Sequence, residues 1–155
     1  MVLLEEMTNQ GFEQYEISNF SVPGHYSKHN SNYWKGVSYL GIGPSAHSFN
    51  GETRQWNVAN NAKYIQALGF NNIPAEREVL TERDRLNEYI MTSLRTIWGL
   101  DINKLEAISK YSGEELLSSA KQFIERQWII RDENTIKLTT EGKLYADKIA
   151  AELFF

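Results

Sequence analysis

Hydrophobic residues follow two different spacings along this sequence of 155 residues. After about residue 80 they recur at every third or fourth position, which is typical of amphipathic helices. The pattern predicts helices over 81–99, 101–111 and 113–127, an alternating hairpin over 128–139, and a closing helix from Thr140. Three helices, a two-stranded wing and a last helix follow one another in a winged-helix domain.

The first 80 residues contain shorter apolar runs that are interrupted by turn residues. They predict helices over 2–10, 25–34 and 61–70, strands over 12–17 and 37–43, a turn at Pro23-Gly24, and a hairpin around Asn50-Gly51. Pro74 and the polar residues up to 80 have the composition of a linker. Because no capping residue precedes the first helix, we expect the chain to begin inside a larger protein.

A composition of 41% hydrophobic and 23% charged residues is typical of a folded protein. The formal net charge is −4, and residues 1–80 and 81–155 each carry −2, so we expect no nucleic-acid partner. No apolar run approaches the ~18 residues of a membrane span, and two early glutamates argue against a secretory signal. We therefore expect a cytoplasmic protein. The absence of cysteine excludes disulfides, thiolate zinc sites and cysteine-ligated clusters within this sequence.

A glycine motif and three histidines lie close together in the first half of the chain. Residues 41–46 fit G-x-G-x-x-A, but a dinucleotide-binding loop needs a helix directly after its glycines, and a hairpin is predicted there. The glycines instead indicate tight backbone geometry. His25 and His29 would share a helical face, with His47 and Glu16 available to complete a zinc site. Solvent-facing histidines are the competing interpretation.

The run His-Asn-Ser-Asn-Tyr-Trp concentrates polar and aromatic chemistry within two helical turns. His29 and Tyr33 are four residues apart, and so are Asn30 and Trp34, so each pair shares a helical face. A flat macrocycle needs aromatic faces to stack on and an imidazole to ligate its iron. Structural packing of the two aromatic residues is the alternative, and the residues alone leave both interpretations open.

Four motifs follow one another between residues 11 and 49. They are Tyr-Glu-Ile-Ser at 15–18, Pro-Gly at 23–24, His-Asn-x-x-Tyr-Trp at 29–34 and Tyr-Leu-Gly-x-Gly-Pro at 39–44. In order and spacing they resemble the radical-SAM family of oxygen-independent coproporphyrinogen III oxidases and the related heme chaperones. The His-Asn-x-x-Tyr-Trp motif is similar to the chaperone branch, and residues 81–155 are similar to the family's helical C-terminal domain.

The resemblance implies an α+β fold with two regions. Residues 1–75 would be the last strands and helices of a radical-SAM (β/α) barrel, and residues 76–155 a mostly helical, winged-helix-like domain. It also implies two groups of site residues. The candidates for binding heme or a porphyrin are His29, Asn30, Tyr33 and Trp34, and the candidates for lining the cavity are Glu16, Gly41, Gly43 and His47.

Members of this family carry a Cys-x-x-x-Cys-x-x-Cys motif for a [4Fe–4S] cluster that cleaves S-adenosylmethionine. This sequence has no cysteine. We therefore expect the C-terminal portion of a longer protein, without catalytic residues or a metal site of its own and inactive as an enzyme by itself. The cluster, S-adenosylmethionine and heme would be cofactors of the intact protein. Its partners would be heme or a porphyrinogen, the missing N-terminal barrel and a recipient heme protein.

The sequence therefore predicts a fragment of a heme chaperone, which binds and delivers heme. One alternative is a fragment of a true oxygen-independent coproporphyrinogen III oxidase, which decarboxylates its substrate oxidatively to protoporphyrinogen IX. A second alternative is a winged-helix module that binds a partner protein. The acidic charge of both halves argues against nucleic acid as that partner.

Overall fold

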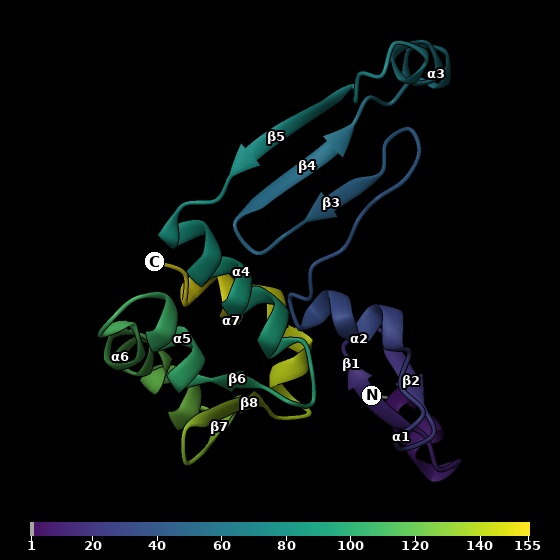
Figure 1. Ribbon diagram of the computed structural model, residues 1–155. Coiled ribbons are helices and arrows are strands. Elements are labelled where there is room, and N and C mark those ends of the chain that lie inside the picture. Colours follow the sequence, from purple (N-terminus) through teal and green to yellow (C-terminus); the bar gives the residue numbers. More distant parts are fainter. Residues whose placement is uncertain (1) are drawn as a thin grey trace. The chain divides into compact units, whose positions relative to one another are not determined.

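The computed structural model describes residues 2–155, which form two compact units (Figure 1). The first unit joins the residues up to Lys35 with Glu82–Phe155, and the second consists of Gly36–Thr81. The first unit combines several helices, and the second unit one helix, with a three-stranded antiparallel sheet, so the α+β class is confirmed. None of the helices within residues 2–155 has the length and apolar character of a membrane span.

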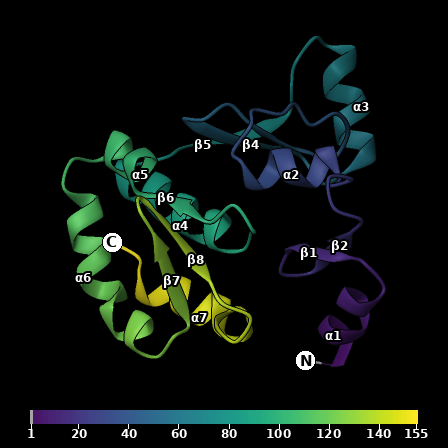
Figure 2. The same cartoon turned by 90° about the horizontal axis from the view of Figure 1, so that it is seen from below.

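Residues 82–155 adopt the winged-helix order that the sequence predicted (Figure 2). The elements are α4 (Glu82–Leu94), β6 (Leu100–Asp101), α5 (Ile102–Ile108), α6 (Ser112–Glu125), β7 (Ile129–Asp132), β8 (Thr135–Leu138), the 3₁₀ helix η1 (Gly142–Tyr145) and α7 (Ala146–Glu152). Strands β7 and β8 form the predicted hairpin. The sheet order is β6-β8-β7, and the two residues of β6 are too few to produce an alternating sequence pattern.

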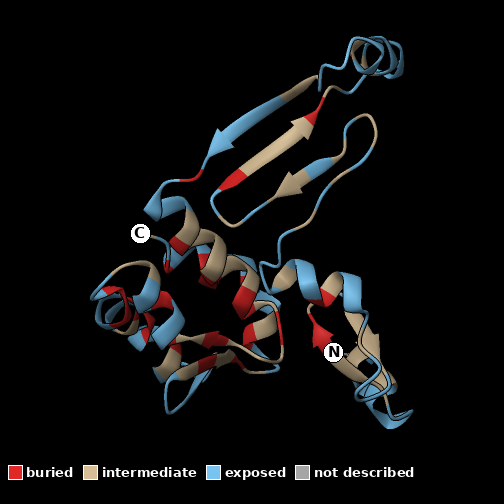
Figure 3. Ribbon diagram, in the orientation of Figure 1, coloured by how far each residue is buried: buried red, intermediate tan, exposed pale blue. Residues whose placement is uncertain are grey.

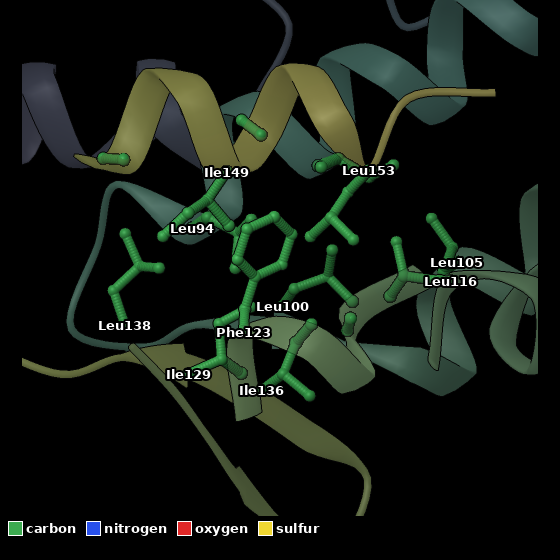
Figure 4. Packing of buried hydrophobic residues seen from close by; sticks show 14 of the residues in the cluster. Leu94, Leu100, Leu105, Leu116, Phe123, Ile129, Ile136, Leu138, Ile149 and Leu153 are labelled. Atoms are coloured by element: carbon green, nitrogen blue, oxygen red, sulfur yellow. The ribbon is translucent and has the colours of Figure 1, made fainter. Parts of the chain in front are cut away.

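One hydrophobic core holds these elements together (Figure 3). Leu86, Ile90 and Leu94 repeat every four residues along α4 and are all buried, because that spacing places them on one helical face. The ring of Phe123 on α6 is 1% exposed and lies among side chains of α7 and of the sheet, including Ile149 (Figure 4). The core therefore depends on contacts between elements far apart in the sequence.

The N-terminal segment of the first unit contains α1 (Val2–Asn9), β1 (Glu13–Glu16), β2 (Asn19–Ser21) and α2 (Lys28–Trp34). Strands β1 and β2 form a short antiparallel hairpin. Two backbone bonds dock β1 on the residues that follow α4: the Ile17 amide donates to the Arg95 carbonyl at 3.0 Å, and the Ile97 amide donates to the Tyr15 carbonyl at 3.1 Å. Backbone hydrogen bonds thereby hold the β1–β2 hairpin to the C-terminal part of the unit.

The second unit is a meander with one helix. Its elements are β3 (His47–Phe49), β4 (Thr53–Asn57), α3 (Asn61–Gly69) and β5 (Ala75–Val79), and its sheet order is β3-β4-β5. The predicted Asn50-Gly51 turn is present: the Asn50 Oδ1 atom accepts from the amides of Glu52 and Thr53, and Gly51 has a φ of 94°. This side chain therefore fixes the register of β3 and β4.

Two predictions in this region were wrong. Residues 37–43 do not form a strand, because their only ladder contact is an isolated bridge between Tyr39 and Phe49, and Gly43 has a φ of 107°. Residues 75–79 form β5 instead of a linker. Its polar residues face cross-strand partners on β4, where the Trp56 indole donates to the Glu76 carboxylate at 3.2 Å. A strand with such polar partners lacks the apolar alternation that identifies strands in a sequence.

Three boundaries also differ from the sequence pattern. Helix α4 ends at Leu94 and not near Gly99, and α2 begins at Lys28 and not at His25. The compact units do not follow the expected boundary at residue 75, because β1 docks on the residues after α4. The assignment of residues 1–75 to the end of a barrel stays a prediction.

We expect amides of the second unit to exchange with solvent faster than those of the first. Within residues 36–81, Leu80 is the one buried hydrophobic side chain, whereas α4 and α6 enclose a continuous core. Fewer buried contacts lower the free energy of local opening. Hydrogen exchange resolved by residue checks this, and equal protection of β4 and α4 would contradict it.

Candidate functional site

The candidate heme helix α2 begins at a side-chain cap. The Ser27 Oγ atom accepts a hydrogen bond from the Asn30 amide at 3.3 Å, which satisfies a donor of the first turn. This cap explains why the helix begins at Lys28, four residues after Gly24 of the Pro23-Gly24 turn. The helix ends at Trp34 with Lys35 as its C-cap, and Gly36 follows with a φ of 65°.

Helix α2 has one face toward the protein and one toward solvent. Ser31 is 6% exposed and is the buried residue of the helix, and the adjacent Asn30 and Trp34 are half-buried. His29 is exposed, and the side chain of Tyr33 is 53% exposed. The four motif residues therefore divide into an inner pair, Asn30 and Trp34, and an outer pair, His29 and Tyr33.

Glu16 is a buried carboxylate behind the inner face of α2. Its side chain is fully buried, and its Oε2 atom accepts hydrogen bonds from the Ser18 amide at 2.9 Å and from the Asn19 side chain. The Asn19 Oδ1 atom in turn accepts from the Asn30 side chain at 3.3 Å. Glu16 is thus connected to the helix through one intervening amide. The expectation that Glu16 lines a cavity stays a prediction.

The charge of Glu16 is balanced by Arg95. The Arg95 Nε atom donates to Glu16 Oε1 at 3.0 Å, and its Nη1 atom donates to the Asp147 carboxylate on α7 at 2.7 Å. The same guanidinium lies over the Trp34 ring, with its Cζ atom 5.2 Å from the ring centre. One cation therefore contacts β1, α7 and α2.

Aromatic contacts continue this interface beside Arg95. The Lys35 ammonium lies 4.2 Å above the centre of the Trp98 ring, and Tyr26 meets Trp98 edge to face. The Tyr26 hydroxyl donates to Glu13, and this hydrogen bond to the carboxylate raises the pKa of the phenol. Two cation–π contacts therefore attach the end of α2 to the segment after α4. In one, Arg95 of that segment lies over Trp34 of the helix, and in the other, Lys35 at the end of the helix lies over Trp98 of the segment.

The remaining cavity candidates, Gly41, Gly43 and His47, belong to the second unit. A Cβ atom at Gly41 would overlap the backbone of His47, which explains the glycine by close backbone approach. The Asn57 side chain donates to the Gly43 carbonyl at 2.9 Å, and the Gly43 amide donates to the Tyr64 hydroxyl at 3.3 Å. The Gly41 amide likewise donates to the Ser48 hydroxyl at 3.0 Å, so internal bonds occupy two of the amides that a phosphate-binding loop would present to its ligand.

The structure thus connects Glu16, Asn30 and Trp34 through one network and turns His29 and Tyr33 outward. Within residues 2–155, no three His, Cys, Asp or Glu side chains are grouped as metal ligands would be. Sequence analysis missed Arg95, because it lies 79 residues from Glu16 and no local pattern joins the two.

Comparison with known proteins identifies the C-terminal part. Residues 80–145 match the profile of the HemN C-terminal domain. This part of the chain is therefore similar to a HemN C-terminal domain. The chain is also 34% identical over 153 residues to the heme chaperone HemW of Bacillus subtilis and 30% identical over 145 residues to that of Lactococcus lactis. The resemblance to the radical-SAM oxidases and heme chaperones is therefore confirmed.

These matches cover most of the chain and less than half of each relative. They span 96% and 90% of this chain but 40% and 37% of the two HemW proteins. A solved structure of coproporphyrinogen III oxidase (HemN) from Escherichia coli, described as a radical-SAM enzyme, superposes with a TM-score of 0.71 at 20% identity. It covers 99% of this chain and 39% of that one, so the HemN-like fold extends beyond the C-terminal domain.

We expect Arg95→Gln to lower the free energy of unfolding by roughly 3 kcal/mol, because it leaves the buried Glu16 carboxylate without its cation. The double variant Glu16→Gln/Arg95→Gln should lose less, since no buried charge remains. Urea unfolding followed by circular dichroism measures both values. Arg83→Gln, at an exposed position of α4, is the control, and additive losses in the double variant would contradict the prediction.

We expect Gly41→Ala to destabilise the second unit by about 1–3 kcal/mol, because the new methyl group would overlap the His47 backbone. Gly69→Ala, at the end of α3, is a matched control with no atom within 4 Å of the new Cβ. Exchange rates of the β3 and β4 amides report local opening. Equal rates in the two variants would refute the proposed role of Gly41.

Proposed function

We propose that the chain is the C-terminal part of a heme chaperone of the radical-SAM family and that α2 presents His29 to heme iron. The observation that carries this proposal is the division of the His-Asn-x-x-Tyr-Trp motif. Asn30 and Trp34 hold the helix to the protein, and the imidazole of His29 is left exposed. Similarity over most of the chain to proteins named heme chaperone supports the ligand.

The chemistry of the outer face suits an iron porphyrin. A neutral imidazole nitrogen donates its lone pair to iron, and the His29 side chain is exposed. Tyr33 lies one turn further along the same face and offers an exposed aromatic ring for contact with the macrocycle. Asn30 and Trp34 act in this proposal by holding the helix.

A [4Fe–4S] cluster, and with it the cleavage of S-adenosylmethionine that the cluster performs, does not fit the residues of this chain, since such a cluster is held by thiolates and the sequence has no cysteine. We assign both to the remaining part of the longer protein. The partners we propose are heme or a porphyrinogen, that N-terminal barrel, and a protein that receives heme. We place the protein in the cytoplasm.

An oxidase of coproporphyrinogen III is the second candidate, because the superposed HemN structure is such an enzyme. At 20% identity the superposition supports a common fold and says nothing of a common reaction. The relatives with higher identity are named heme chaperones. We therefore prefer heme binding to porphyrinogen oxidation.

We expect hemin to bind this chain with a saturable shift of the Soret band that His29→Ala abolishes. The reason is that an imidazole ligand changes the electronic state of ferric heme, and His29 is exposed on the face opposite the anchors of α2. Absorbance titration measures the shift and the Kd. His25→Ala, at another exposed histidine before α2, is the matched control and should retain the band.

Loss of the band in both variants equally, or in neither, would contradict ligation by His29. If the wild-type chain shows no shifted band, the same titration of the full-length protein is decisive. A band there that depends on His29 would show that the barrel contributes to the site. Its absence from the full-length protein would refute the proposal.

A further inference from the structure

We propose that Arg95 is the positioning residue of α2: its guanidinium fixes the rotation of the helix about its own axis, so that His29 and Tyr33 face outward. The expected effect of Arg95 on heme binding rests on the proposed function. The geometric part depends only on contacts within the first unit.

The guanidinium of Arg95 contacts both the support and the helix. It is paired with the fully buried Glu16 and with Asp147 on α7, so its position is set by two carboxylates on different elements. Its Cζ atom lies 5.2 Å from the centre of the Trp34 ring. A cation held between two anions gives that ring a fixed point of attachment, which an exposed and mobile side chain would not provide.

A second connection reaches the helix one turn earlier. Glu16 accepts from the Asn19 side chain, and Asn19 accepts from Asn30 at 3.3 Å. Asn30 and Trp34 are four residues apart and therefore lie on one helical face. Two attachments on one face, separated by a turn, determine the rotation of a helix as well as its location.

The direction of His29 follows from this rotation. Successive residues in a helix are separated by about 100°. The inner positions Asn30, Ser31 and Trp34 thus occupy one side, and His29 and Tyr33 lie toward the other. The short helix of seven residues has little stability alone, so the orientation depends on the attachment.

Lysine at position 95 would not replace arginine. A lysine ammonium can neutralise Glu16, but it lacks the planar group that bonds two carboxylates while it lies over a ring. Arg95→Lys therefore separates charge balance, which it keeps, from orientation of α2, which it should weaken. The double variant Glu16→Gln/Arg95→Gln removes both charges without leaving one buried.

The test measures hydrogen exchange and hemin binding in the wild type, Arg95→Lys, the double variant and the control Arg83→Gln. The informative amides are those of Ser31 and Lys35, which donate to the Ser27 and Ser31 carbonyls at 2.9 and 3.0 Å. We expect both test variants to lose protection at these amides at least about tenfold, with α4 and α6 unchanged. Hemin Kd should rise about tenfold in the same variants.

If the Ser31 and Lys35 amides keep their protection in Arg95→Lys, the positioning role is overturned. It is also overturned if these amides lose protection while the hemin Kd and the Soret band stay unchanged. If the double variant does not fold, Arg95→Lys decides alone. A wild-type chain without a His29-dependent band, followed by the same result for the full-length protein, would refute heme binding. In that case the exchange data still decide whether Arg95 orients α2.

Discussion

The ion pair between Glu16 and Arg95 is the constraint on which the first unit depends. A carboxylate that is fully removed from water is stable only with a cation and hydrogen-bond donors around it, and Glu16 has both. The two partners come from segments 79 residues apart. Their pairing therefore requires that β1 docks on the segment after α4, and this docking in turn places α2 beside Arg95 and Trp98.

In this arrangement the winged-helix part supports a helix of the N-terminal segment. In DNA-binding winged helices the third helix enters the major groove. Here that helix, α6, exposes Glu114, Glu115 and Glu125, which a phosphate backbone would repel. Arg95, which is paired with Asp147 on α7, contacts Trp34 of α2. The domain acts as a scaffold for α2.

Local sequence patterns were sufficient to predict the elements that depend on interactions between neighbouring residues. The periodicity of Leu86, Ile90 and Leu94 predicted α4, and Asn50-Gly51 predicted its hairpin, because a helical face and a tight turn each depend on neighbouring residues. Strand β5 was missed because its stabilising partners lie on β4 and its own side chains are polar. The candidate residues on α2 came from their chemistry and helical spacing together with family resemblance, but Arg95 required three-dimensional contacts that no sequence spacing encodes.

The motif on α2 shows how one sequence pattern can satisfy two competing demands. A ligand site must leave an imidazole and an aromatic ring in contact with water, and a helix of seven residues must bury side chains to persist. Residues four positions apart lie on the same face of a helix, so two such pairs can serve the two demands. Asn30 and Trp34 face inward and hold the helix, and His29 and Tyr33 face outward. The sequence presented packing and ligand binding as alternatives for this motif, and under the proposed function they fall to different residues of it. The aromatic contact between Tyr33 and Trp34, 5.2 Å between ring centres, joins the two faces and makes the outer ring sensitive to how the inner one is held.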